Sequence, residues 1–209
     1  MPRIKIAVFI SGRGSNLKTI LDKIDNKEID GEVKVVISDR EKAKGLSYVE
    51  KKDIQGIYIG NNNYNNSFER TEKTLEILKK NDIDLIVLAG YMSIIPKKIV
   101  EKYRNRIINI HPSLIPSFCG KGYYGKKVHE KVVEYGVKIT GATVHFVDEG
   151  TDTGPIILQK PVEVYFNDTV ESLSKRVLDV EHKILPLAIK LFTEDRIHVK
   201  GRKVKIYYK

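Results

Sequence analysis

The chain has 209 residues, 41% of them hydrophobic, a formal net charge of +10 and a single cysteine. This length can bury one sizeable core, so we expect a single domain, and no window of about 18 uninterrupted apolar residues predicts a membrane-spanning helix. Because the lysines are spread along the chain and the lone Cys119 cannot form an internal disulfide, we expect a cytoplasmic protein with a solvated basic surface rather than a nucleic-acid or membrane binder.

The first predicted elements are a strand, a glycine-rich turn and a helix. Residues 4–10 are a nearly continuous apolar run, which is typical of a strand buried on both faces. The turn at residues 11–16 (SGRGSN) leads into a helical pattern, so its backbone N–H groups and the helix dipole can bind a phosphate. A dinucleotide fingerprint would need a third glycine where the chain has Leu17, so we expect a single phosphate group. Helix capping alone would also explain the serine and asparagine of this turn.

Strand and helix patterns then alternate along the chain. Further strands are predicted at residues 33–38, 54–59, 84–89 and from 107 to 111, and helices at residues 43–52, 68–80 and 97–103. Such alternation predicts a parallel sheet with ligand sites at the carboxyl ends of its strands. The loop at residues 90–96 is unusually apolar; it either packs onto the next helix or forms the wall of a pocket for a flat aromatic cofactor.

A polar pair lies at the end of the strand that begins at Ile107. Asn109 and His111 are two residues apart, so their side chains point to the same side of the strand and could act on one substrate atom. Pro112 cannot continue a central strand, so we place this pair at the strand's end. Histidine titrates near neutral pH and can donate or accept a proton. The alternative is a histidine that only caps the turn.

The pattern changes in the second half of the chain. After a glycine-rich loop at residues 117–127 and a helix at 128–135, two strands at residues 138–147 and 156–164 are predicted to form an antiparallel pair. A long helix follows from a cap at residues 167–169, and the tail at 196–209 alternates apolar and basic residues, as in a hairpin or edge strand. The expected fold is therefore three-layer α/β, with a mostly parallel twisted sheet of about seven strands and helices on both faces.

Several motifs together resemble one enzyme family. Residues 109–116 (NIHPSLIP) resemble the signature of formyltransferases that use 10-formyltetrahydrofolate, and residues 147–159 (VDEGTDTGPIILQ) are similar to their second motif. The turn at residues 11–16 and residues 88–92 (LAGYM) resemble members that formylate glycinamide ribonucleotide. The resemblance covers about residues 3–193, and the pairing of motifs is more specific than any one of them. It implies a formyltransferase-like domain.

The resemblance also implies how that domain is divided and what it binds. Residues 1–105 would form a Rossmann-like phosphate-binding half, residues 106–195 a catalytic and folate-binding half, and residues 196–209 a C-terminal tail. The co-substrate would be 10-formyltetrahydrofolate and the acceptor glycinamide ribonucleotide. The protein would act on these small molecules as a monomer or homodimer, without nucleic acid or membrane. No metal is implied, since the five histidines show no ligand spacing.

The resemblance implies a catalytic group of three residues. The acceptor's amine attacks the formyl carbon, and Asn109 and protonated His111 would donate hydrogen bonds to the negative oxygen of the tetrahedral intermediate. Asp152 would complete the group by raising the pKa of His111 and fixing its ring, and it could also hold a water that moves the proton. Asp152 could instead be an ordinary turn residue, because Asp-Thr-Gly is common in turns.

The binding residues are carried over from the same resemblance. The phosphate would be bound by Gly14, Ser15 and Asn16, and the ribose hydroxyls by Glu181. The folate would contact Met92, Ser93, Ile94, Ile95 and Asn109, with the loop from Asp148 to Asp152 covering its pterin-like ring. Two features depart from the family: its basic residue near the folate's glutamate tail is missing, with Arg70 as a possible substitute, and the loop after Pro116 is longer.

Three other functions remain open at this point. Methionyl-tRNA formyltransferases share the motifs, and a basic charge would suit tRNA, but they normally carry a further C-terminal domain that this chain lacks. A formyltetrahydrofolate hydrolase would carry an extra N-terminal domain. A non-catalytic nucleotide- or RNA-binding module would tolerate substitution of Asn109 and His111.

Overall fold

The computed structural model describes residues 3–50, 52–60, 63–64 and 66–208. Its contacts divide the chain into two compact units, Met1–Ile108 and Asn109–Lys209, which we call unit 1 and unit 2. The single-domain organisation and its subdivision at residue 105 stay predictions. None of the helices in the described part of the chain is long and apolar enough to cross a bilayer.

The helices and strands follow the predicted alternation. Unit 1 contains β1 (Ile4–Ile10), α1 (Ser15–Asp25), β2 (Gly31–Ser38), the short 3-10 helix η1 (Lys44–Tyr48), β3 (Gln55–Tyr58), α2 (Ser67–Lys80), β4 (Leu85–Leu88) and α3 (Lys97–Lys102). The strand β5 (Ile107–His111) begins in unit 1 and ends in unit 2. Unit 2 continues with α4 (Lys126–Tyr135), β6 (Ile139–Phe146), β7 (Ile156–Glu163), α5 (Val170–Thr193), β8 (Ile197–Lys200) and β9 (Lys203–Ile206).

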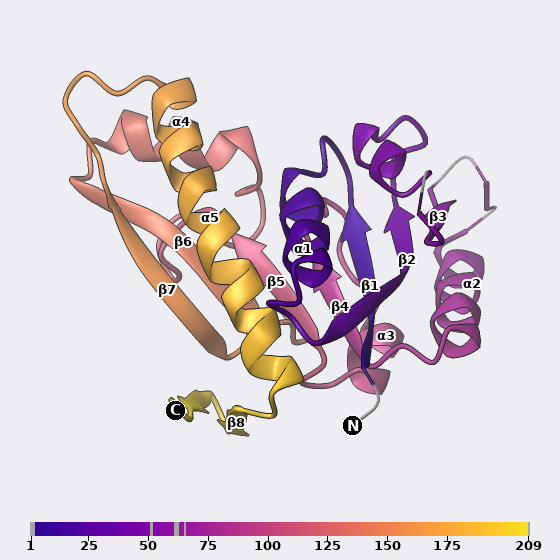
Figure 1. Ribbon diagram of the computed structural model, residues 1–209. Helices are drawn as coiled ribbons and strands as arrows, with labels where there is room; N and C mark the ends of the chain where they lie inside the picture. The colour runs from indigo at the N-terminus through magenta and orange to yellow at the C-terminus, as the bar shows by residue number, and fades with distance from the viewer. Residues whose placement is uncertain (1–2, 51, 61–62, 65, 209) are drawn as a thin grey trace. The chain divides into compact units, whose positions relative to one another are not determined.

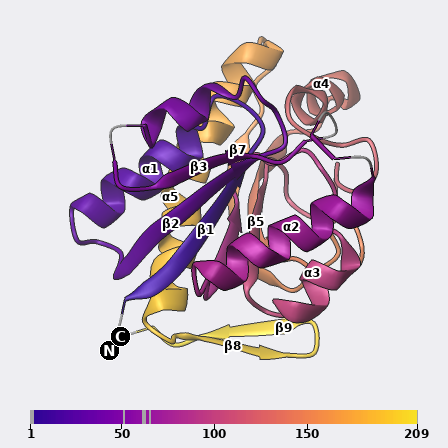
Figure 2. The ribbon, with the colours of Figure 1, turned by 90° about the vertical axis from the view of Figure 1, so that its right-hand side faces the viewer.

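The predicted fold class is confirmed. Seven strands form one sheet in the order β3-β2-β1-β4-β5-β6-β7, and β8 and β9 form a separate two-stranded sheet. The pairs of β1 with β2 and β4, and of β2 with β3, are parallel, whereas β6 and β7 are antiparallel. In unit 1, α1 covers one face of the strands and α2 and α3 cover the other (Figures 1 and 2).

The centre of unit 1 is β1, whose residues from Ile6 to Ile10 are at most 1% exposed. This burial on both faces explains the uninterrupted apolar run in the sequence. Val8 pairs with Val36 of β2 and with Val87 of β4, so the carboxyl ends of the three strands lie at one edge. The loops that leave this edge therefore lie where ligands bind in open α/β sheets.

One predicted helix of unit 1 is wrong in length. The pattern at residues 43–52 predicts a helix, but the structure has only the 3-10 turn η1, and residue 51 lies outside the described residues. The backbone N–H of Gly45 donates to the carbonyl of Gly12 at 3.0 Å, and a Cβ on Gly45 would lie 3.0 Å from the Cα of Gly14. This contact with the glycine-rich turn ties the segment to its neighbour and takes the place of a longer helix.

Unit 2 is built on the β6–β7 pair, and α5 packs against both strands and against α4. A capping box begins α5, in which the Thr169 side chain accepts from Ser172 N–H and the Ser172 side chain accepts from Thr169 N–H. Apart from Glu181, the buried residues of α5 are apolar and recur at helical spacing, as predicted. The tail forms a hairpin in which Val199 of β8 pairs with Val204 of β9, so the hairpin prediction is confirmed.

Candidate functional site

The glycine-rich turn of unit 1 joins the carboxyl end of β1 to the start of α1. Gly14 is the residue before the helix and has a φ of 74°, and Ser15 and Asn16 are the first two residues of α1. A Cβ on Gly14 would lie 2.6 Å from the Cα of Gly45, so glycine is required by both backbone conformation and space. The three predicted phosphate-binding residues therefore lie together at a helix N-terminus, where backbone N–H groups and the helix dipole favour anions.

In the apolar loop after β4, different residues fit each of the two interpretations left open by the sequence, packing onto the next helix or lining a pocket. Ile95 is 8% exposed and packs into unit 1, whereas Met92 is 43% and Ile94 80% exposed. Ser93 Oγ donates to Asp39 Oδ2 at 2.6 Å, which ties the loop to the residue after β2. Met92 and Ile94 thus leave apolar surface exposed, as the pocket interpretation requires, whereas Ile95 is buried, as the packing interpretation requires.

The candidate catalytic residues meet in unit 2. His111, at the end of β5, is 4% exposed, and its Nδ1 lies 3.5 Å from Asp152 Oδ2. Its Nε2 lies 2.9 Å from the carbonyl oxygen of Phe118. Asn109 Nδ2 lies 3.1 Å from His145 Nε2, which in turn lies 3.7 Å from Asp152 Oδ1. The structure therefore brings Asn109, His111 and Asp152 together and adds His145 to the group.

The loop that carries Asp152 is held by its own polar groups. Asp148 Oδ1 accepts hydrogen bonds from Gly150 N–H at 3.1 Å and from Thr153 Oγ1 at 2.5 Å. A Cβ on Gly154 would lie 1.8 Å from the carbonyl oxygen of Phe146, so only glycine lets the loop pack this closely on the end of β6. Asp148, predicted to contact the folate, is thus half-buried and already engaged in shaping the loop.

A second set of hydrogen bonds fixes the turn after His111. Thr143 Oγ1, on β6, donates to the carbonyl of Ser113 at 2.6 Å and accepts from Ile115 N–H at 3.1 Å. Gln159 of β7 donates to the carbonyl of Ile115 at 2.9 Å. This network of unit 2 places the signature segment against β6, so the position of His111 depends on side chains far from it in the sequence.

The pKa values of the group depend on burial as well as on its charges. Burial lowers the pKa of His111, and this effect outweighs the carboxylate of Asp152 and the Phe118 carbonyl, which both raise it. Asp152 thus raises the pKa of His111, as predicted, but burial, which the sequence did not reveal, lowers the net pKa. Burial raises the pKa of Asp152, but its interactions with His145 and His111 and the N–H of Gly120 lower it by a larger amount, so the net pKa is lowered. Asp152 is thus an ionised carboxylate at neutral pH.

His145 fixes the orientation of the Asn109 amide. Its Nδ1 lies 2.7 Å from the carbonyl of Phe146, which can only accept, so Nδ1 carries the proton of the neutral ring. Nε2 must then accept from the Asn109 NH₂ group, and the second N–H of that group has no hydrogen-bond partner among the residues that the structure describes. Sequence reasoning missed His145 as a site residue. It could have been found from its position on a buried strand, because it lies two residues after Thr143 and on the same side of the strand.

The long loop after Pro116 also contributes groups that the sequence did not reveal. The carbonyl of Phe118 contacts His111, and the N–H of Gly120 donates to Asp152 Oδ2 at 2.9 Å. These are backbone groups, so no residue type signals them. Between them lies Cys119, whose thiol contacts the Pro116 carbonyl at 3.3 Å and whose pKa is raised by burial and by the charge of Asp152.

The remaining predicted residues lie elsewhere in their units. Glu181 is on α5 of unit 2 and is 9% exposed, so an acid that reads as a helix-surface residue is in fact buried. Arg70 is on α2 of unit 1 and is half-buried. Both have interaction partners within the protein. Among the residues that the structure describes, no three His, Cys, Asp or Glu side chains are grouped closely enough to hold a metal ion.

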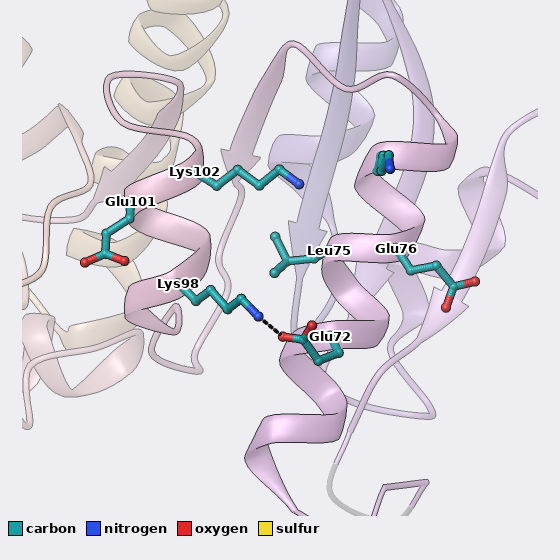
Figure 3. A pocket seen from close by; sticks show the side chains of 7 residues that line it. Glu72, Leu75, Glu76, Lys98, Glu101 and Lys102 are labelled. Carbon is teal, nitrogen blue, oxygen red and sulfur yellow. Dashed lines mark hydrogen bonds and ion pairs between the residues drawn. The ribbon is translucent and has the colours of Figure 1, made fainter.

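A groove of about 610 Å³ runs between α2 and α3 in unit 1 (Figure 3). Its lining is mostly charged, and Lys98 of α3 donates to Glu72 of α2 at 2.5 Å across it. None of the predicted site residues lines it. It lies between the helices of one layer, so it is a separate feature from the loops at the strand ends.

Comparison with known proteins gives concordant results. Residues 4–189 match the family described as formyl transferase. The chain is 38% identical over 196 residues to the phosphoribosylglycinamide formyltransferase of Haemophilus influenzae. The aligned region covers 94% of this chain and 90% of that protein. It is also 38% identical over 195 residues to the chloroplastic phosphoribosylglycinamide formyltransferase of Vigna unguiculata, where 93% of this chain spans 62% of the relative's length.

A solved structure agrees with the sequence relatives. The crystal structure of glycinamide ribonucleotide transformylase 1 from Symbiobacterium toebii superposes with a TM-score of 0.92 at 42% identity, and the match covers 99% of this chain and 95% of that one. The likeness therefore includes the fold and both units of the chain.

Proposed function

The chain belongs to the formyl transferase family, and from that membership we propose that it transfers the formyl group of 10-formyltetrahydrofolate to the amine of glycinamide ribonucleotide. The products are formylglycinamide ribonucleotide and tetrahydrofolate, in de novo purine biosynthesis. The match over nearly the full length of the Haemophilus influenzae and Symbiobacterium toebii enzymes supports this activity. The single observation that carries it is the grouping of Asn109, His111 and Asp152 in unit 2.

In this mechanism Asn109 stabilises the developing negative charge. One N–H of its amide is held by His145, so the other can donate to the formyl oxygen as that oxygen becomes an oxyanion. A preorganised donor of this kind is worth about 10²–10³ in rate. His145 acts through Asn109 and is a positioning residue.

His111 moves the proton. The attacking amine must lose a proton and N10 of the folate must gain one. Because burial lowers its pKa, His111 is available in its neutral form to accept that proton. Its Nε2–H faces the Phe118 carbonyl, so the proton is accepted at Nδ1, beside the ionised Asp152. Asp152 then stabilises the imidazolium until the proton passes to N10.

The binding residues follow the family pattern and form part of the same proposal. Gly14, Ser15 and Asn16 hold the phosphate, Glu181 holds the ribose hydroxyls, and Met92, Ser93, Ile94, Ile95, Asn109, Asp148 and Asp152 surround the folate. The helix start in unit 1, preceded by Gly14 with a φ of 74°, and the exposed apolar side chains of Met92 and Ile94 support these two assignments. The enzyme would be cytoplasmic, in keeping with its lone Cys119, and would act as a monomer or homodimer without a metal.

The test is a direct assay. The protein is incubated with glycinamide ribonucleotide and a 10-formyl folate, and deformylation of the folate is followed by absorbance. We expect deformylation that depends on the ribonucleotide. Deformylation without it would indicate a hydrolase, formylation of methionyl-tRNA would indicate the sister transferase, and no turnover with any acceptor would contradict an enzymatic role.

A further inference from the structure

Ser11 of unit 1 makes hydrogen bonds on both sides of Tyr91, in the loop after β4. It is the first residue of the glycine-rich turn, and its backbone N–H donates to the carbonyl of Gly90 at 3.2 Å. Its side-chain Oγ accepts from the backbone N–H of Met92 at 2.7 Å. Under the proposed function, on which this inference rests, the turn holds the phosphate of one substrate and the loop that starts at Gly90 holds the other.

Each of these two segments is anchored elsewhere in unit 1 as well. The turn is tied to η1, where Gly45 N–H donates to the Gly12 carbonyl at 3.0 Å. The loop is tied to β2, where Ser93 Oγ donates to Asp39 Oδ2 at 2.6 Å. Ser11 bonds the turn to the loop itself, so a shift of the turn is passed to the backbone at Met92.

Two features of the loop after β4 would let it respond to a shift of the turn. Gly90 has a φ of 75°, and Met92 and Ile94 are exposed with their apolar side chains only partly packed. A ligand that covers these side chains must fix their rotamers and their position on the loop, at a cost in conformational entropy. A turn already fixed by a bound phosphate lowers that cost through Ser11.

We infer that Ser11 couples the two substrate sites, so that each substrate binds more tightly when the other is present. The coupling is reciprocal by thermodynamic necessity. The factor by which the ribonucleotide raises the folate affinity equals the factor by which the folate raises the ribonucleotide affinity. Ser11 is thus a positioning residue whose effect lies in the dependence of one affinity on the other.

Isothermal titration calorimetry under anaerobic conditions tests this with glycinamide ribonucleotide and tetrahydrofolate. Tetrahydrofolate carries no formyl group, so the ternary complex forms without turnover. In the wild type we expect each Kd to fall by about fivefold or more when the other ligand is saturating. In Ser11→Ala, which removes the acceptor for Met92 N–H, the two Kd values should become independent. Ser11→Cys, of similar size but a weak acceptor, serves if the alanine variant does not fold.

Ser93→Ala is the matched control, because it removes a serine hydroxyl from the same loop but leaves the bond to Ser11. It should weaken folate binding and keep the coupling factor. Coupling that persists in the Ser11 variants, that is absent from the wild type, or that is lost equally in Ser93→Ala overturns the inference. A wild type that binds neither ligand overturns the proposed function instead, so the two failures are distinguishable.

Discussion

In unit 1 the residues proposed to bind the substrates lie in two short continuous segments, 14–16 and 92–95, and offer backbone N–H groups and exposed apolar surface. In unit 2 the residues proposed to act on them come from four separated segments and include buried ionisable groups. Binding and catalysis are therefore sensitive to substitution in different parts of the chain. Substitutions in these two segments of unit 1 should change binding and leave the chemical step intact, whereas substitutions of Asn109, His111 and Asp152 in unit 2 should change the rate or its pH dependence.

His111→Ala gives the largest expected effect. Loss of the proton acceptor should lower kcat by about 10³-fold, while substrate affinities stay within about tenfold, because the phosphate and folate contacts lie on other residues. Steady-state kinetics and calorimetric binding measure the two quantities. His198→Ala, an exposed histidine on β8, is the control and should keep the wild-type kcat. An unimpaired kcat in His111→Ala would remove the mechanism.

Asp152→Asn should lower kcat by about 10²-fold, because the amide keeps the size of the side chain but cannot stabilise the protonated His111. Asp152 raises the His111 pKa against the effect of burial, so its loss lowers that pKa further. His111 must be neutral to accept the proton, so the acidic limb of kcat/KM should move to lower pH. Asp195→Asn, at an exposed residue of positive φ, should leave the profile in place. A limb that moves to higher pH contradicts this reasoning.

His129→Leu tests a buried group of unit 2 that the mechanism does not use. Burial, with a smaller effect of His111, lowers the pKa of His129 to about 4. The unfolded chain therefore binds the proton more tightly, and stability is lost as pH falls from about 6.5 towards 4, by about 3 kcal/mol in all. The leucine variant should lose this part of the pH dependence, measured by denaturant unfolding at several pH values. His198→Leu should keep the wild-type slope.

Gly14→Ala should act on binding and on local stability. The alanine must take a φ of 74°, and its Cβ would lie 2.6 Å from the Cα of Gly45, so we expect a loss of about 1–3 kcal/mol and a tenfold rise, roughly, in KM for the ribonucleotide. Gly136→Ala is a matched control: its φ is also 74°, but nothing lies within 4 Å of its Cβ. It should cost less stability and leave KM unchanged; an equal KM effect would undo the assignment of the turn.

Ile94→Ser should give the smallest effect. The side chain is 80% exposed, so its removal should change the free energy of unfolding by no more than about 0.5 kcal/mol. Folate loses an apolar contact, so its KM should rise about threefold with kcat unchanged. Ile139→Ser, another exposed isoleucine at the start of β6, should alter neither quantity. An unchanged KM for the folate in Ile94→Ser would show that this loop does not contact the folate.

The parts of the fold that local patterns encode were predictable. The apolar run of β1 reflects burial on both faces, and the spacing of Leu173, Val177 and Ile184 reflects the single buried face of α5. The helix predicted at residues 43–52 was wrong because its length is limited by a contact between Gly45 and the glycine-rich turn. Periodicity within one segment cannot report such a contact.

The part of the site that could be predicted consists of residues whose side chains carry the function. Asn109, His111 and Asp152 could be named because the resemblance pairs two distant motifs. The Phe118 carbonyl and the Gly120 N–H could not, because every residue carries these groups. The net direction of the His111 pKa also needs the structure, since it depends on whether burial or the neighbouring carboxylate has the larger effect.

The thiol of Cys119 has a consequence for inhibitor chemistry. It lies one residue from Gly120, whose N–H binds Asp152, so an electrophile that reacted there would place its adduct beside the proposed catalytic group. The raised pKa of this thiol leaves little thiolate at neutral pH, and alkylation is correspondingly slow. A covalent inhibitor would therefore have to dock reversibly and selectively before it reacts, with bond formation as the slow second step.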